Sequence, residues 1–285
     1  MSASATTIPV ALPRKDASSA IWLPAFSLWW REMIRFVRQP ARVIGVLLPP
    51  LFFWLLMGFG FSTSFHQTGI GGEHFLQYFF PGMLLMIVLF ASIFSMMSLI
   101  QDRNEGFLLS VMAAPISRSA IVLGKVLGGT TIAAIQGLLL LFVAPLIGIH
   151  LGFAQLAIVV AAIFMVSFLL TALGFAIAWP MDSPQAFHQI VNLFLLPMWL
   201  LSGSLFPVTG AASKLQYVMR ANPLTYGVNA MLIAMSPASG NNASDALGLG
   251  THPVLKSLGI VLAFCAVIFS VAFVIVNRRT TKPAA

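Results

Sequence analysis

Residues 83–106 read MLLMIVLFASIFSMMSLIQDRNEG. The run carries no charged side chain as far as Ile100, and charges then follow at Asp102, Arg103 and Glu105. A helix needs about 20 mostly apolar residues to cross a bilayer. The pattern therefore predicts the end of a membrane span followed by a polar loop.

The composition of the whole chain supports a membrane location. Of its 285 residues, 59% are hydrophobic and only 8% are charged, whereas soluble domains carry roughly 25% charged residues. We expect an all-α membrane protein, with a membrane domain over residues 41–277 and cytosolic tails over 1–20 and 278–285. The apolar runs that predict six transmembrane helices lie near 41–62, 77–100, 120–147, 153–179, 187–206 and 254–276.

Basic residues give the expected orientation. With the N-terminus placed inside, only Lys214, Arg220 and Lys256 of the 15 lysines and arginines fall in outer segments. Lysine and arginine concentrate on the cytoplasmic side of membrane proteins, so we expect both termini to be cytoplasmic. Because the net charge of +8 is explained in this way, nucleic acid is not an expected partner. Residues 1–20 lack the pattern of a cleaved signal.

The segment before the first span has two faces. Helical spacing predicts an amphipathic helix over residues 21–39 that lies in the cytosolic interface; the alternative is a helix that only anchors the chain. The apolar face comprises Phe26, Trp30, Met33 and Val37. The basic face comprises Arg31, Arg35 and Arg38.

The loop of residues 101–119 predicts a second cytosolic helix. Asp102 and Glu105 have capping-box spacing, and Pro115 would end the helix. Its expected apolar face is made by Phe107, Leu108, Val111 and Met112. Either the membrane surface or a groove on a partner protein could bury this face, and we favour the partner.

The spans carry few groups for chemistry. No carboxylate or histidine lies at mid-membrane, which argues against an ion-coupled carrier or channel, and no polar cluster favours an intramembrane enzyme. Gly124-Lys125 lacks the rest of a phosphate-binding loop, so we expect no catalytic residue, no metal site and no ATP site in this chain. Gly124 and Gly128 form a GxxxG motif, which predicts a close helix contact within the chain or with a second copy.

Two motifs give a family resemblance. The stretches Asn104-Glu105-Gly106, Ala114-Pro115-Ile116-Ser117-Arg118 and Leu123-Gly124-Lys125 form the first, and LLSGSLFPV at 200–208 with ANPLTY at 221–226 forms the second. Together they resemble ABC transporter permeases of the type-2 export class, over residues 21–277. That class includes drug-resistance, nodulation and polysaccharide export permeases and shares its fold with the eukaryotic G-subfamily transporters.

The resemblance implies an architecture and partners. Two permeases, expected here as a homodimer, would work with two copies of a separate ATPase that binds ATP and Mg. Residues 104–114 would form the coupling helix and residues 21–39 the connecting helix. The short segments 211–219 and 224–235, with Asn222 and Pro223 suited to a helix start, would be outer re-entrant helices. The expected ATPase-coupling residues are Arg103, Asn104, Glu105, Gly106, Phe107, Leu108, Val111, Met112, Arg31 and Arg35.

The resemblance also implies a function. We expect export of a hydrophobic or amphiphilic cargo, drug-like or lipid-like, across a bacterial inner membrane; the alternative cargo is a glycolipid or polysaccharide. Aromatic and methionine side chains of the second and fifth spans would line the cargo cavity. These are Phe90, Phe94, Met96, Met97, Phe194, Met198 and Trp199.

Overall fold

The computed structural model describes residues 21–65, 72–114, 116–205, 208, 211–236, 247, 249 and 252–278. The predicted tail over 1–20, Pro115 and all but the first residue of the tail over 278–285 lie outside this range. All the regular elements in the described residues are helical, which confirms the expected all-α class.

The helices are labelled in the order in which they occur along the chain. Their bounds are α1 (Trp22–Arg38), α2 (Pro40–Phe65), α3 (Gly72–Ser95), α4 (Met97–Asn104), α5 (Phe107–Ala113), α6 (Arg118–Leu141), η2 (Ala144–Ile147), α7 (Phe153–Ala178), α8 (Pro184–Trp199), η3 (Leu200–Ser204), α9 (Ser213–Ala221), α10 (Pro223–Met235) and α11 (Pro253–Asn277).

Five helical runs of the described chain are long and apolar enough to cross a membrane. They are Phe79–Asn104, Arg118–Ile147, Phe153–Ala178, Pro184–Ser204 and Pro253–Asn277. The remaining predicted span lies in α2, which meets α1 at a bend of 66°. Counting that bent pair as one span gives six. A multi-span helical bundle is therefore confirmed, with five or six crossings.

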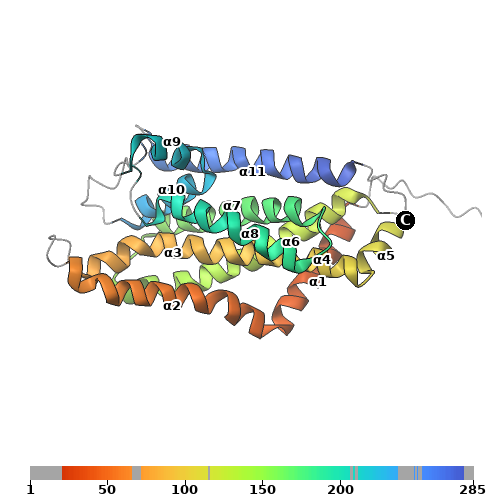
Figure 1. The fold of residues 1–285 in the computed structure, drawn as a ribbon, viewed down its shortest axis with the longest axis horizontal. Coiled ribbons are helices and arrows are strands. Elements are labelled where there is room, and N and C mark those ends of the chain that lie inside the picture. The colour runs from red at the N-terminus through yellow and green to blue at the C-terminus, as the bar shows by residue number, and fades with distance from the viewer. Residues whose placement is uncertain are drawn as a thin grey trace, which may run out of the picture.

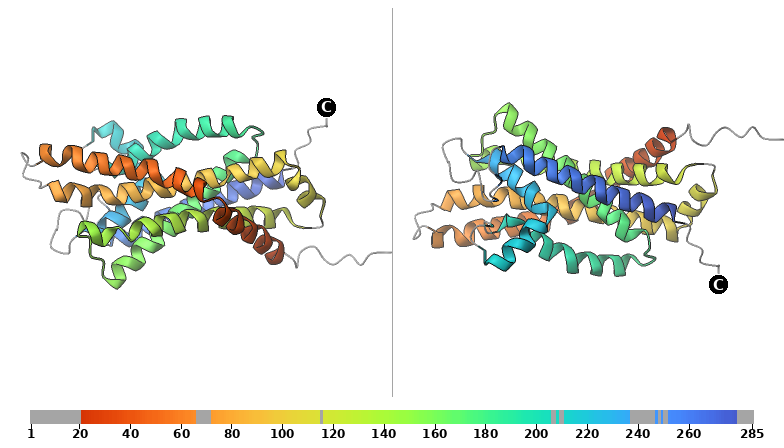
Figure 2. Two further views of the ribbon diagram at one scale, coloured as in Figure 1. Left: turned by 90° about the horizontal axis from the view of Figure 1, so that it is seen from below. Right: turned by 90° about the horizontal axis from the view of Figure 1, so that it is seen from above.

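The centre of the bundle is formed by α3, α6 and α7, which pack against one another. Side chains such as Phe80, Met83, Ile87 and Phe175 are fully buried there. Around this centre, α2 packs on α3, and α10 and α11 pack on α7 (Figures 1 and 2). The helix α1 leaves the bundle axis at an angle to α2 (Figure 2).

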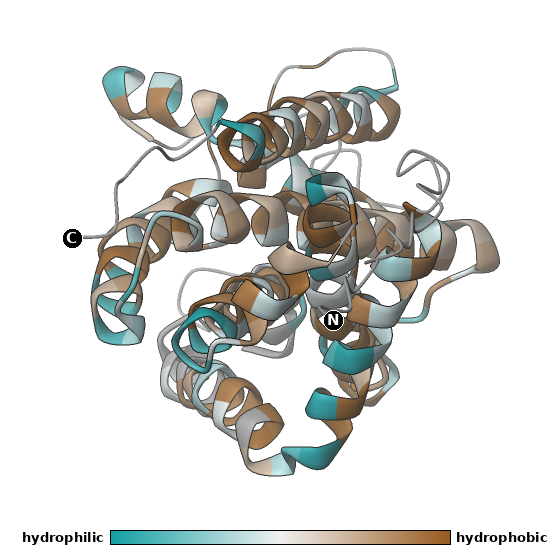
Figure 3. Ribbon diagram, turned by 90° about the vertical axis from the view of Figure 1, so that its right-hand side faces the viewer, coloured by the Kyte–Doolittle hydropathy of each residue, from teal (hydrophilic) through white to brown (hydrophobic). Residues whose placement is uncertain are grey.

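The two ends of the bundle differ. The helices α4 and α5 and the last turn of α11 lie at one end, while α9 and α10 lie at the other (Figure 1). Arg118, which begins α6, donates to the carbonyl oxygen of Val276 at 3.2 Å and so joins α6 to α11 at the α5 end. Viewed from that end, brown apolar segments run along the helices (Figure 3).

The ANPLTY part of the second motif, residues 221–226, forms the turn from α9 into α10. The Asn222 side chain accepts a hydrogen bond from the N–H of Leu224 at 3.0 Å, and Pro223 begins α10; the predicted helix start is confirmed. The Asn222 amide also donates to the carbonyl oxygen of Met198 at 2.6 Å, which ties this turn to α8. Gly203 has φ of +84°, a conformation that favours glycine.

Candidate functional site

A close contact between α1 and α6 builds the site. The ideal position of a Cβ at Gly124 is 2.6 Å from the carbonyl oxygen of Ala25, and that at Gly128 is 3.0 Å from the Cβ of Glu32. Larger residues would push α1 away, whereas glycine lets the two helices approach. The GxxxG motif therefore joins two helices of the same chain.

This approach brings Glu32 of α1 to Lys125 of α6. The Lys125 Nζ lies 2.6 Å from Glu32 Oε1 and also contacts Asp102 Oδ2 of α4. All three side chains are buried, with exposed fractions of 1%, 4% and 0% for Lys125, Glu32 and Asp102. The lysine therefore joins three helices from within the protein.

Two arginines complete the pairing of Asp102. Arg31 donates to both of its carboxylate oxygens at 2.8 Å, and Arg35 donates to Oδ1 at 3.1 Å. The prediction that Asp102 caps the start of a helix is thus wrong, because Asp102 lies in the last turn of α4. We call the five residues Glu32, Lys125, Asp102, Arg31 and Arg35 the charge cluster.

The charge cluster fixes α1 against the end of α4. Removing charges from water costs several kcal/mol per ion unless they are paired and hydrogen-bonded. Lys125 and Asp102 each have two oppositely charged partners or more. Displacing α1 would remove Glu32, Arg31 and Arg35 and leave Lys125 and Asp102 paired only with each other, so the cluster opposes independent movement of α1 and α4.

The turn from α4 into α5 carries the predicted coupling residues. Asn104 ends α4, Glu105 follows, and Gly106 has φ of +77°, so the expected helix over 104–114 is the shorter α5. The Arg31 guanidinium lies 3.7 Å from the centre of the Phe107 ring. This cation–π contact joins α5 to the charge cluster.

The apolar face of α5 differs from the prediction. Leu108 is buried and Val111 is half-buried, both against the core of this chain, as is Phe107. The exposed apolar side chains are Leu109, at 63%, and Met112, at 43%. The face that is free to contact a partner is therefore narrower, and it includes Leu109, which the sequence pattern did not select.

Arg103 ties α4 to the turn between α7 and α8. It donates to the carbonyl oxygens of Met181, at 3.0 Å, and Trp179, and pairs with Asp182 at 3.2 Å. Asn104 donates to the Asp182 carbonyl oxygen at 3.2 Å. A displacement of α4 would thus reach the start of α8 through direct contacts.

Aromatic residues of α3 extend from this end toward the middle of the bundle. The rings of Phe90 and Phe94 stack at 5.6 Å, and Phe94 stacks on His188 of α8 at 4.9 Å. Phe90, Phe94 and Met97 are half-buried. His188 is exposed and was not among the predicted cavity residues.

The remaining predicted cavity residues divide into two groups. Phe194 is 66% exposed and Met198 is half-buried on α8. Met96 and Trp199 are buried in the core, and Trp199 donates to the carbonyl oxygen of Gly82 at 2.8 Å. We therefore remove Met96 and Trp199 from the predicted wall, because neither reaches the surface of this chain.

The charge cluster was not predicted from the sequence. Glu32 shares one helical face with Ala25 and Leu28, both buried, and Lys125 interrupts an apolar run. A carboxylate and a lysine in apolar surroundings each need a partner. The spacing of Glu32 on that face was the signal that could have found the pair.

The apolar helical bundle, with the charge cluster at its α5 end, defines a polytopic membrane protein. A profile of the ABC-2 type transporter family matches residues 25–236. The chain belongs to this family and is one of its permeases.

Named relatives agree with that assignment. The chain is 28% identical to a Cyanophora paradoxa protein named as a transport permease, ycf38, over 75% of this chain and 74% of the relative. It is 22% identical to the daunorubicin resistance ABC transporter permease protein DrrB1 of Streptomyces coeruleorubidus, over 74% of each chain. It is 25% identical to nodulation protein J of Neorhizobium galegae, over 92% of this chain and 94% of the relative.

Proposed function

We propose that this permease exports a hydrophobic or amphiphilic compound and is driven by a separate ATPase that docks on α5. The observation that carries the proposal is the exposure of Leu109 and Met112 on a helix whose other side is fixed to the charge cluster. A short helix presents little area, so a groove that encloses these two side chains would suit it.

The charge cluster gives the docked helix a way to transmit force. A push on α5 passes through Phe107 and Arg31 to α1 and α4. From α4 it passes through Arg103 to the start of α8, whose Phe194 and Met198 are proposed cavity residues. Rigid ion-paired joints transmit a displacement better than flexible loops, because their parts move together.

The assembly that fits is two permeases with two ATPases, in a bacterial inner membrane with both termini cytoplasmic. ATP and Mg would be bound by the ATPase. The exposed apolar side chains of α8, Ile190, Leu193 and Phe194, suit either lipid or a second copy. A homodimer would place two such helices around one cavity.

The proposed cargo class rests on the residues and on one relative. Phe90, Phe94, Met97, Phe194 and Met198 provide adaptable apolar surface, and one relative is named for daunorubicin resistance. A glycolipid or polysaccharide remains the alternative cargo, and neighbouring glycosyltransferase genes would favour it. A neighbouring ATPase gene supports either version.

Co-purification with the ATPase tests the docking proposal. The ATPase encoded beside this permease should co-purify with the wild-type chain. It should also co-purify with the control variant Leu146→Glu, because Leu146 is 83% exposed in η2, a segment far from α5 in the sequence. Leu109→Glu should reduce the bound ATPase at least about tenfold, because a carboxylate would enter an apolar groove. Equal recovery with both variants would show that α5 does not dock the ATPase.

A further inference from the structure

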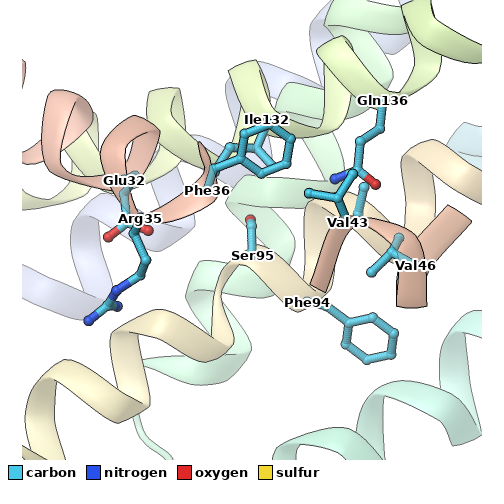
Figure 4. Close-up of a pocket in the computed structure, with 10 residues that line it drawn as sticks. Glu32, Arg35, Phe36, Val43, Val46, Phe94, Ser95, Ile132 and Gln136 are labelled. Carbon is cyan, nitrogen blue, oxygen red and sulfur yellow. The ribbon is translucent and has the colours of Figure 1, made fainter. Parts of the chain in front are cut away.

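Two helices flank the aromatic residues of α3. On one side, Phe94 borders a narrow crevice together with Val43 and Val46 of α2 (Figure 4). On the other side, the Phe94 ring stacks on the ring of His188 of α8, with 4.9 Å between their centroids. Phe90 and Phe94 are both half-buried, so part of α3 stays accessible between α2 and α8. We call the accessible surface of these two phenylalanines the α3 strip.

Aromatic side chains close the α3 strip toward the α9 end of the bundle. The ring of Trp199 of α8 lies 6.2 Å from that of Phe53 of α2 and 6.3 Å from that of Phe79 of α3. The rings of Phe53 and Phe79 also lie 6.3 Å apart. The helices α2 and α8 therefore meet over α3 at this end.

Asn192 of α8 lies beside the α3 strip. It follows His188 by four residues and precedes Trp199 by seven, and these spacings place all three residues on one side of a helix. The helices α3 and α8 run in opposite directions, since His188 contacts Phe94 and Trp199 contacts the first part of α3. Asn192 is therefore level with Phe90, near the middle of both spans.

An exposed amide is unusual at this depth of a membrane. Asn192 follows Pro184, the first residue of its span, by eight positions, or about 12 Å along the helix. Its side chain is exposed and makes no hydrogen bond within the part of the chain that the structure describes. Lipid tails cannot pair with an amide, and polar residues inside membrane spans commonly mark the path of a substrate. The amide therefore needs a polar partner other than lipid.

The charges around the α3 strip favour an uncharged partner. The sequence has no lysine, arginine, aspartate or glutamate over residues 43–61, 79–100 and 184–204. The charged residues that line the crevice beside Phe94 are Glu32 and Arg35, and both are paired within the charge cluster. A charged group that entered the strip would lose water without gaining a counter-charge. Hydroxyl and amide groups suit Asn192 better, because its amide both donates and accepts hydrogen bonds.

We propose that Asn192 determines specificity in the cargo wall, and that the α3 strip binds an amphiphile with an aromatic body and an uncharged hydroxyl or amide group. The aromatic body lies against Phe90 and Phe94, and the polar group forms a hydrogen bond with Asn192. His188 holds Phe94 in its stack and adds a second polar group at the edge of the strip. This inference rests on the proposed function, since it names the class of cargo for the same wall.

Equilibrium dialysis of the purified full-length permease in detergent micelles tests the inference without the ATPase. The probes are pyrenemethanol, ethylpyrene and pyrenemethylammonium, which carry their substituents at the same ring position. Binding is measured relative to protein-free micelles of the same detergent. We expect wild type to bind pyrenemethanol about fivefold more tightly than ethylpyrene, which has nearly the same size but no hydroxyl. Pyrenemethylammonium should bind no more tightly than ethylpyrene.

Two matched variants assign the preference to one residue. Asn192→Leu should reduce the preference for pyrenemethanol over ethylpyrene to about twofold or less. It should also fold, because a leucine suits the apolar middle of a membrane span. Asn277→Leu, the same change at an exposed position of α11, should keep the preference of wild type.

The outcomes separate this inference from the proposed function. Equal binding of pyrenemethanol and ethylpyrene by wild type, or an unchanged preference in Asn192→Leu, would overturn the inference and leave ATPase docking on α5 intact. Binding of none of the probes would contradict the cargo wall as well. A second copy that covers Asn192 would instead give a disulfide-linked dimer of Asn192→Cys permeases in oxidised membranes, and a high yield of that dimer would also overturn the inference.

Discussion

Lys125 Nζ lies 2.6 Å from Glu32 Oε1, and both side chains are buried. The pair joins a helix near the start of the chain to a central helix of the bundle, and Asp102 extends the contact to α4. The same few atoms therefore decide both the position of α1 and the anchoring of the proposed coupling helix.

Replacing the central lysine should destabilise the protein strongly. In Lys125→Met, Glu32 and Asp102 lose a buried cation, and removal of one partner of a buried pair costs about 3–5 kcal/mol. We expect a clearly lower melting temperature of the purified permease than in wild type. Lys214→Met, at an exposed lysine, is the control, and equal losses in the two variants would contradict the role of the cluster.

Gly124 should not tolerate even one additional methyl group. The Cβ of Gly124→Ala would stand 2.6 Å from backbone of α1, so α1 should separate and become more accessible to protease. Gly259→Ala in α11 is the matched control, because nothing lies within 4 Å of its Cβ position, and it should be neutral or stabilising by about 0.5–1 kcal/mol. Equal protection of α1 in both variants would exclude close α1–α6 packing.

Arg31 should not be replaceable by lysine. Arg31 binds both oxygens of Asp102 and covers the Phe107 ring, and an ammonium cannot make this forked contact. We expect Arg31→Lys to lower cargo transport per ATP hydrolysed, measured in vesicles that contain the complete transporter. Wild-type coupling in this variant would mean that a positive charge is sufficient.

Glu105 and Phe107 should affect coupling for different reasons. Glu105 is 62% exposed and lies 3.8 Å from Arg35, so Glu105→Ala should mainly weaken the contact with the ATPase. Phe107→Ala removes the ring under Arg31 and should loosen α5 itself. Both variants should insert normally and hydrolyse ATP with reduced transport, and wild-type efflux from both would remove the case for a coupling helix.

Much of the fold follows from apolar run length alone. The spans after residue 77 and the start of α10 at Pro223 were predictable because bilayer crossing and helix capping are local requirements. The break between α3 and α4 at Met96 was not, since neither glycine nor proline marks it.

The site was predictable only in part. The position of α5 followed from the polar residues after Ile100, but the partners of Asp102 come from residues far away in the chain. Capping-box spacing favoured a local role for Asp102, and three cations brought by α1 and α6 override that preference. Likewise, packing against the core reverses the expected exposure of Phe107 and Leu108.

Site-specific cross-linking tests most directly whether α5 docks the ATPase. The single native cysteine, Cys265, is buried, so Leu109→Cys and Leu146→Cys can each carry a short thiol-reactive photo-cross-linker in membranes that contain the ATPase. We predict a covalent permease–ATPase product from position 109 and none from position 146. Absence of the product at 109, or labelling of that cysteine by an impermeant reagent added outside intact cells, would contradict the proposal.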